Sequence, residues 1–231
     1  MRVLAARFGV SEMTIRRDLA MLESEGLLVR THGGAVSAGK LRFLQSAIPN
    51  YEASPLKGAI GAAAARLVTP GQTVMIDTGT TAMEVARHLP QDEEITVITT
   101  SLCVAQELYG SPIRLLLLGG FLRREFPSTY GPLTENTLGH LHVDMLFMGC
   151  DGADSTDGFY SSDLHVANQE QSMIRIAERV VVVTASRKFG HRAFSRYARV
   201  PEVHAVVTDA GLSAEDRAKL EEQGVHIIIA G

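Results

Sequence analysis

The stretch Val74-Met75-Ile76-Asp77-Thr78-Gly79-Thr80-Thr81 joins an apolar strand to a polar turn and the start of a helix. The run Thr73 to Ile76 predicts a buried strand, and the pattern Thr81 to His88 predicts the helix. A strand that leads directly into a helix is the repeating unit of a parallel α/β sheet, in which ligands bind beyond the carboxyl ends of the strands. The stretch therefore predicts both the fold class and the place of a site.

The polar turn has the composition of an anion-binding loop. Gly79 allows backbone N–H groups to approach an anion at a helix N-terminus, and the threonine hydroxyls add further donors. We predict that Asp77, Thr78, Gly79, Thr80 and Thr81 bind a small effector, whose phosphate group is held by the backbone N–H groups at Gly79 and by the threonine hydroxyls. An ordinary helix cap explains the same residues equally well, because Ser, Thr and Gly are favoured at such positions.

The alternation of strands and helices continues from Pro55 to the C-terminus. Apolar runs predict strands at Ile95–Ile98, Arg114–Leu118, Met145–Met148, Val180–Val183, Ala205–Val207 and His226–Ile229. Amphipathic patterns predict helices at Leu56–Leu67, Leu102–Leu108, Val166–Ala177 and Ala214–Gln223. This order predicts an α/β domain built on a mostly parallel sheet with both faces covered.

Small or hydroxylic residues also follow the next two predicted strands. They are Thr100, Ser101, Gly119 and Gly120. Because ligands bind beyond the carboxyl ends of strands in such sheets, we expect these residues and the threonine-rich turn to form one polar cradle.

Charged residues later in the chain complete the predicted site. Asp151 and Glu170 can hydrogen-bond sugar hydroxyls, and Lys188 can meet a phosphate as a point charge. Acidic residues are mostly exposed, so surface loop and helix-cap roles are the alternative for Asp151, Asp154 and Glu170.

Residues 1–36 have a separate pattern of helix, turn and helix. Arg2–Phe8 predicts a short helix, and Ser11 is placed to cap a second helix in which Ile15 and Leu19 share one face. Leu27 to Val36 then predicts two short strands around a turn, which is the form of a wing.

Hydroxyl and arginine side chains lie mostly off the apolar face of the second helix. Because a recognition helix uses such groups for phosphates and base edges, we predict that DNA is contacted by Ser11, Thr14, Arg16, Arg17 and His32. Residues 1–42 carry seven Lys or Arg against four Asp or Glu, although the whole chain has a net charge of −4. The alternative is an amphipathic helical hairpin whose basic face is solvated.

The composition limits the class of protein. With 231 residues, 45% of them hydrophobic, the chain can fill one large core and a small second domain. No apolar run approaches the roughly 20 residues of a membrane-spanning helix, and no secretory pattern is present, so a cytoplasmic protein is expected. Cys103 and Cys150 lie in apolar segments and are predicted to be reduced thiols. We expect no cofactor and no metal, since His140 and His142 have only Asp144 nearby.

Several motifs of the N-terminal region occur together: Phe8-Gly9-Val10-Ser11, Thr14-Ile15-Arg16-Arg17-Asp18-Leu19, Leu22-Glu23, Gly26-Leu27-Leu28 and His32-Gly33-Gly34-Ala35. This combination closely resembles the winged helix-turn-helix signature of the DeoR family of transcription regulators. In that family another helix usually precedes the one that begins near Arg2. We therefore expect weak operator binding by these residues unless about 15 to 20 further residues precede them.

A second group of motifs resembles the DeoR C-terminal sensor domain: Lys57, Ile60-Gly61, Asp77 to Thr81, Thr96-Val97, Leu118-Gly119-Gly120, Gly131, Asp144, Phe147-Met148-Gly149, Glu170, Lys188-Phe189-Gly190 and Thr208-Asp209. The resemblance implies a fold similar to ribose-5-phosphate isomerase and the CoA transferases, and a role in sensing phosphorylated sugars or related metabolites. Thr100 and Ala185 stand where Asn and Asp are usual, which leaves the effector's identity open.

The resemblance implies a DNA-binding repressor of a carbohydrate-metabolism operon that responds to a phosphorylated sugar. We expect a homo-oligomer, because dimers read paired half-sites. The expected organisation is a DNA-binding domain at 1–36, a linker at 37–54 and an effector domain at 55–231. The alternative is a sugar-phosphate isomerase, for which Gly152-Ala153-Asp154 and Glu170 are present. Residues 155–169 lack that enzyme's lysine, so we expect binding without turnover.

Overall fold

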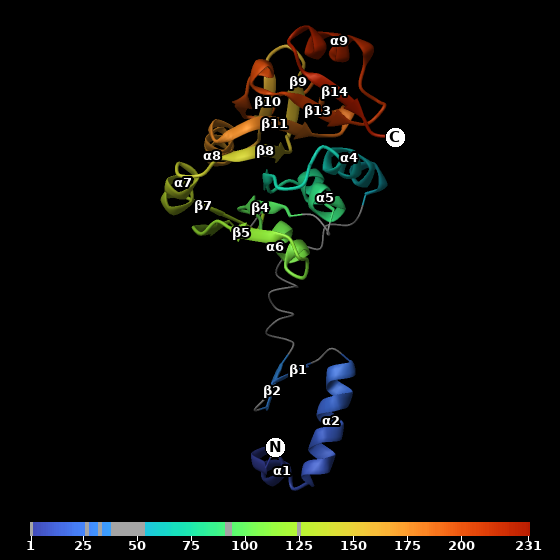
Figure 1. Cartoon of the computed structure of the whole chain (residues 1–231), viewed down its shortest axis with the longest axis vertical. Coiled ribbons are helices and arrows are strands. Elements are labelled where there is room, and N and C mark those ends of the chain that lie inside the picture. Colours follow the sequence, from blue (N-terminus) through green and yellow to red (C-terminus); the bar gives the residue numbers. More distant parts are fainter. Residues whose placement is uncertain (1, 26–27, 32–33, 38–53, 91–93, 124–125) are drawn as a thin grey trace. The chain divides into compact units, whose positions relative to one another are not determined.

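The structure is a computed structural model that describes residues 2–25, 28–31, 34–37, 54–90, 94–123 and 126–231. The chain forms two compact units, an N-terminal unit (Met1–Asn50) and a C-terminal unit (Tyr51–Gly231) (Figure 1). His32, which the sequence assigns to DNA contact, lies outside the described residues, as do residues 38–53 of the predicted linker.

The N-terminal unit has the predicted sequence of helix, turn, helix and wing. It contains helices α1 (Arg2–Phe8) and α2 (Glu12–Ser24) and the antiparallel strands β1 (Leu28–Thr31) and β2 (Gly34–Ser37). The Ser11 hydroxyl accepts a hydrogen bond from the Thr14 backbone N–H at 3.1 Å and so caps α2. Ile15 and Leu19 are buried on the face of α2 that packs against Leu4 of α1.

The C-terminal unit is built on seven parallel strands in the order β14-β13-β11-β8-β3-β4-β5 (Figure 1). Along the chain they are β3 (Thr73–Ile76), β4 (Thr96–Thr99), β5 (Arg114–Leu117), β8 (Val143–Met148), β11 (Ala177–Val183), β13 (Ala205–Thr208) and β14 (His226–Ile229). All seven were predicted, with small differences at their ends. Their apolar runs are recognisable because central parallel strands are buried on both faces.

The helices of this unit are α4 (Pro55–Ala65), α5 (Thr80–His88), α6 (Leu102–Leu108), α7 (Pro132–Leu138), α8 (Leu164–Arg175) and α9 (Ala214–Glu222), with 3-10 turns η1 (Ser186–Lys188) and η2 (Val200–Glu202). The chain proceeds from β3 to β4 and β5 in one direction across the sheet, and from β8 to β11, β13 and β14 in the other. Right-handed connections therefore place α5 and α6 on one face and α8 on the other. The order reverses between β3 and β8, which is where such sheets bind ligands.

Several elements escaped the sequence analysis. They are the antiparallel pair β6 (Phe121–Arg123) and β7 (Ser128–Tyr130), helix α7, and a three-stranded antiparallel sheet of β9 (Gly152–Asp154), β10 (Gly158–Ser161) and β12 (Ser195–Ala198). Each of these strands is three or four residues long and mixes polar residues or glycine with apolar ones, so it lacks the apolar run that marks the strands of the main sheet. Gly158 has a φ of +141°, and a Cβ there would meet the carbonyl oxygen of Ala198, so the close pairing of β10 with β12 requires glycine.

Candidate functional site

A cavity of about 440 Å³ opens at the carboxyl ends of β3, β8 and β11. Residues 77–81 after β3, residues 149–151 after β8 and residues 184, 185, 187 and 188 after β11 line it, together with residues of α4, β10 and α8. Asp77 directly follows β3 and is also bonded to β8, because its backbone N–H donates to the carbonyl oxygen of Phe147 at 3.0 Å. The cavity thus lies at the point where the strand order reverses.

The cavity collects eight of the twelve residues that the sequence assigns to effector binding. These are Asp77, Thr78, Gly79, Thr80, Thr81, Asp151, Glu170 and Lys188. They come from segments up to 111 residues apart in the chain, from Asp77 to Lys188. Only the fold brings them together.

The other four predicted residues do not line this cavity, so the structure does not bring the three consecutive strand ends together around it. Thr100 and Ser101 follow β4 and are buried, and the Ser101 hydroxyl caps α6 by accepting from the Val104 N–H at 3.2 Å. Gly119 and Gly120 follow β5, and a Cβ on Gly120 would lie 2.3 Å from the Thr134 hydroxyl oxygen. Ser101 thus caps a helix, and Gly120 allows a close contact. Both follow strands that lie on the far side of β3 from the reversal point.

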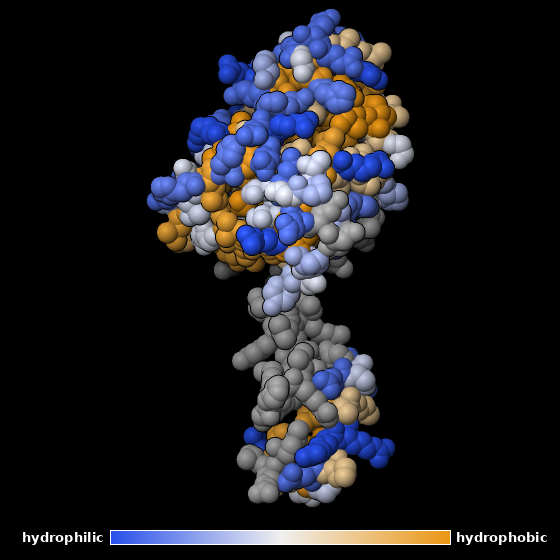
Figure 2. Space-filling view, viewed as in Figure 1, coloured by the Kyte–Doolittle hydropathy of each residue, from blue (hydrophilic) through white to orange (hydrophobic). Residues whose placement is uncertain are grey.

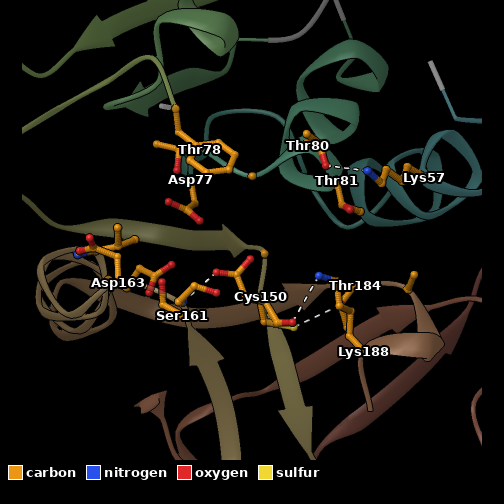
Figure 3. A pocket seen from close by; sticks show the side chains of 18 of the residues that line it. Lys57, Asp77, Thr78, Thr80, Thr81, Cys150, Ser161, Asp163, Thr184 and Lys188 are labelled. Carbon is orange, nitrogen blue, oxygen red and sulfur yellow. Dashed lines mark hydrogen bonds between the residues drawn. The ribbon is translucent and has the colours of Figure 1, made fainter. Parts of the chain in front are cut away.

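One side of the cavity is cationic. The Lys57 ammonium, from the first turn of α4, donates to the Thr80 hydroxyl at 2.7 Å (Figure 3). Burial lowers the pKa of Lys57, and the nearby cations Arg187 and Lys188 lower it further. The ammonium of Lys188 donates to the carbonyl oxygen of Asp151 at 3.2 Å. Positive groups that repel one another in this way are stabilised when an anion binds between them.

The same side contains the N-terminus of α5. Its N-cap is Gly79, which has no side chain with which to cap the helix. In α2, α6, α8 and α9 a Ser or Asp side chain accepts from the first backbone N–H groups. The N–H groups at the start of α5 have no side-chain cap, and they carry the positive end of the helix dipole, which favours an anion.

The opposite side is acidic. Figure 3 shows Ser161 and Asp163 across the cavity from Lys57 and Thr80. Asp163 caps α8 by accepting from the backbone N–H of His165 at 2.7 Å. The carboxylate of Asp151 accepts from the Ser162 N–H at 2.8 Å. Both acids are therefore partly engaged in loop structure, as the alternative interpretation of Asp151 supposed.

Asp77 and Glu170 are the buried carboxyls of the cavity wall. Burial raises the pKa of Asp77, although the backbone N–H groups of Thr78 and Gly149 hydrogen-bond to its carboxyl. Burial also raises the pKa of Glu170 well above its ordinary value, and the negative charge of Asp77 adds to this. One carboxyl oxygen of Glu170, Oε2, is buried without a hydrogen-bond partner among the described residues. The Oε2 atom of Glu170 therefore has unused hydrogen-bonding capacity at the cavity wall.

Sequence analysis missed several lining residues, notably Lys57, Arg123, Ser161, Asp163 and Arg187. Lys57 was part of the family motif but was assigned no role, and Arg187 directly precedes Lys188. Ser161 gave no signal, because β10 was not recognised as a strand.

The cysteines and histidines form no metal-binding group within the part of the chain that the structure describes. Burial raises the pKa of the Cys150 thiol to about 12, and its Sγ donates to the Thr184 hydroxyl at 3.2 Å. Among the described residues no group of three His, Cys, Asp or Glu could hold a metal ion. Within the same residues no helix is long and apolar enough to span a bilayer.

In the N-terminal unit the predicted DNA-contacting residues lie at the start of α2. Arg16 and Arg17 are exposed, as are Ser11 and Thr14, whose hydroxyl oxygens lie 2.9 Å apart. The Ser11 hydroxyl thus caps the helix and also bonds to the Thr14 hydroxyl, and both residues are exposed.

Comparison with known protein families matches both units. Residues 2–40 match the DeoR-like helix-turn-helix domain, and residues 52–210 match the DeoR C-terminal sensor domain. The structure of eIF2B beta from Chaetomium thermophilum superposes with a TM-score of 0.51 and 13% identity, covering 73% of this chain and 53% of that one. Ribose 5-phosphate isomerase A from Methanocaldococcus jannaschii superposes with a TM-score of 0.43 and 21% identity, covering 58% of this chain and 53% of that one.

Curated relatives align over nearly the whole chain. A putative aga operon transcriptional repressor of Escherichia coli O157:H7 is 34% identical over 99% of this chain and 86% of its own length. The HTH-type transcriptional regulator GlpR of Haloferax volcanii is 36% identical over 97% of this chain and 89% of its own length. With both domain families matched in order, the chain belongs to the DeoR family of transcriptional regulators.

Proposed function

We propose that this regulator binds a phosphorylated sugar, or a related small phosphorylated metabolite, in the cavity at the ends of β3, β8 and β11. The observation that carries the proposal is that one cavity contains both a group of cations and two buried carboxyls. Lys57, Arg187 and Lys188 gather near the uncapped start of α5, and Asp77 and Glu170 form the wall beyond it. A phosphate suits the first group and sugar hydroxyls suit the second. The volume of about 440 Å³ is in the usual range for small-molecule sites.

Ligand binding would then control operator binding by the N-terminal unit. The ligand favours one arrangement of the units or subunits, and the affinity for DNA changes by the same coupling free energy. Curated relatives named as transcriptional repressors support a repressor of a carbohydrate-metabolism operon. Such a protein acts in the cytoplasm, where its operator is.

The effector proposal is tested by the thermal unfolding of the whole chain with pentose and hexose monophosphates. A matching ligand at about 100 times its Kd should raise the Tm by about 5 to 10 °C, because it binds the native state alone. The Lys57→Met variant should bind this ligand about 10- to 100-fold more weakly, since it loses a charged hydrogen-bond donor. Arg66→Met, an exposed cation at the end of the same helix, should bind like the wild type.

Three outcomes would contradict the proposal. The first is no stabilisation by any sugar phosphate of a broad panel. The second is equal stabilisation by the unphosphorylated sugars, which would mean that the phosphate group does not contribute to binding. The third is aldose–ketose interconversion of ribose 5-phosphate that disappears in Glu170→Gln, which would make the protein an isomerase. That assay matters because Lys57 and Lys188 supply the cavity with the cations that residues 155–169 lack.

The DNA-binding proposal assigns base or phosphate contacts to Ser11, Thr14, Arg16, Arg17 and His32. On an operator selected from random duplexes by the wild-type chain, Arg17→Ala should bind about 10- to 100-fold more weakly. Arg217→Ala removes the same charge from the C-terminal unit and should leave the affinity unchanged. Equal affinities of Arg17→Ala and wild type in a mobility-shift titration would exclude Arg17 from the interface.

A further inference from the structure

Large apolar side chains of β5, β6 and α7 in the C-terminal unit are exposed to water. Leu116 and Leu117 of β5, Phe121 and Leu122 of β6 and Leu133 of α7 are between 40% and 69% exposed. Figure 1 shows β5, β7 and α7 together at one side of the unit, and hydrophobic residues appear on that side in Figure 2. We call these five side chains the β5–α7 surface.

Strand β5 has the sequence of a buried strand in an exposed position. Its residues are Arg-Leu-Leu-Leu, yet only Leu115 is even partly buried, whereas three of the four residues of the neighbouring β4 are buried. A parallel sheet normally has both faces covered, and an uncovered apolar edge strand promotes association. In the described part of the chain, β5 pairs with β4 alone and forms one end of the sheet. The composition of β5 therefore indicates that another surface covers this strand, and the described residues of the chain do not supply that surface.

The β6–β7 pair leads to the same conclusion. Successive residues of a strand point to opposite faces, and both Phe121 and Leu122 are exposed, so neither face of β6 is covered. The pair has three residues in each strand and includes a contact of Phe121 with Tyr130, with ring centroids 6.1 Å apart. A two-stranded pair is marginal by itself, and contact with a further surface would stabilise it.

We propose that a second copy of this chain covers the β5–α7 surface, so that the C-terminal units form a dimer through it. The five side chains leave on the order of 500 Å² of apolar area in water. A standard interface buries about 800 Å² per partner with a core that is roughly 65% apolar, so this patch supplies the core that one partner needs. A twofold axis beside the patch would pair it with itself, and a chain with one helix-turn-helix unit needs a second copy to read paired half-sites. The proposal does not depend on the effector.

The test is sedimentation velocity of the full chain over a concentration series, with Phe121→Asp and a matched control, Phe194→Asp. Phe194 is also highly exposed but lies before β12, outside the β5–α7 surface. The wild type and Phe194→Asp should dimerise alike, and Phe121→Asp should raise the dimer Kd at least about 30-fold. Leu133→Asp on α7 is the second variant, because its side chain is the most exposed of the five and its loss should leave the fold intact. Far-UV circular dichroism checks the fold of each variant.

Two results would overturn the proposal. If the wild-type chain stays monomeric at the highest concentrations, no second copy covers this surface. Hydrogen exchange of that monomer would then show whether the β5 amides are protected. Protection would point to residues 38–53 of the same chain as the cover. A dimer that tolerates both folded variants, Phe121→Asp and Leu133→Asp, uses a different surface.

Discussion

Replacing Gly61 with alanine is expected to lower the free energy of unfolding of the C-terminal unit by about 2 to 4 kcal/mol. Gly61 lies in α4 where this helix packs directly on α5. A Cβ at this position would lie 2.5 Å from the backbone carbonyl carbon of Glu84 and 2.7 Å from its oxygen. Backbone atoms cannot rotate away as a side chain can, so the two helices must separate.

The same substitution should weaken effector binding, because the two helices carry the two partners of the cationic side. Lys57 lies one turn before Gly61 on α4, and Thr80 begins α5, so a shift of either helix lengthens their 2.7 Å hydrogen bond. Urea denaturation gives the stability, and titration with the ligand from the thermal screen gives the affinity. Gly58→Ala is the matched control on the same helix. Its nearest neighbour would be Glu84 Oε2 at 3.9 Å, and alanine there should stabilise the protein by about 0.4 to 1 kcal/mol. If Gly61→Ala were as stable as Gly58→Ala, the helix contact would be looser than described.

Glu170→Gln is expected to remove a strong pH dependence of stability. Below the ordinary glutamate pKa of 4.5, the Glu170 carboxyl is protonated in the folded and unfolded chains alike. As the pH rises above this value, the unfolded chain loses the proton, but the folded chain keeps it because burial raises the pKa of Glu170. The wild type then loses about 1.4 kcal/mol per pH unit until the pKa of the folded state is reached. A glutamine cannot ionise, so the variant lacks this loss.

The measurement is the difference in unfolding free energy between Glu170→Gln and the wild type from pH 4.5 to pH 8. Other carboxyls, such as Asp154 and Asp209, have a lowered pKa in the folded state and change the stability with pH in the opposite direction. Their contribution is the same in both proteins, so it cancels in this difference. It should grow with pH in favour of the glutamine variant. Glu222→Gln makes the same substitution at an exposed position and is the matched control. A flat difference for Glu170→Gln would mean that this carboxyl is ionised in the folded protein.

Local pattern was enough to predict the strands of the main sheet and most helices, because apolar runs and helix caps are properties of neighbouring residues. It also identified the turn at Asp77–Thr81, since a strand, a glycine and threonine hydroxyls occur in one short stretch. Strand order is not local. Placing Thr100 and Gly120 in the site assumed that β4 and β5 border it, whereas β8 and β11 do.

The same limit explains the residues that were missed. Lys57 enters the cavity only because α4 packs on α5, and Ser161 only because β10 pairs with β9 and β12. Both pairings join segments whose own sequences do not specify a partner. Glu170 was assigned from its chemistry, but its burial and its unpartnered oxygen required the fold.

The position of Lys57 in the chain gives the proposed regulator a simple means of relaying its signal. Helix α4 is the first element after residues 38–53, and Lys57 lies in its first turn. Under the proposed function, a phosphate that draws the Lys57 ammonium inward would act directly on the first helix that follows these residues. The response to the ligand would then begin at the N-terminal end of the sensor domain.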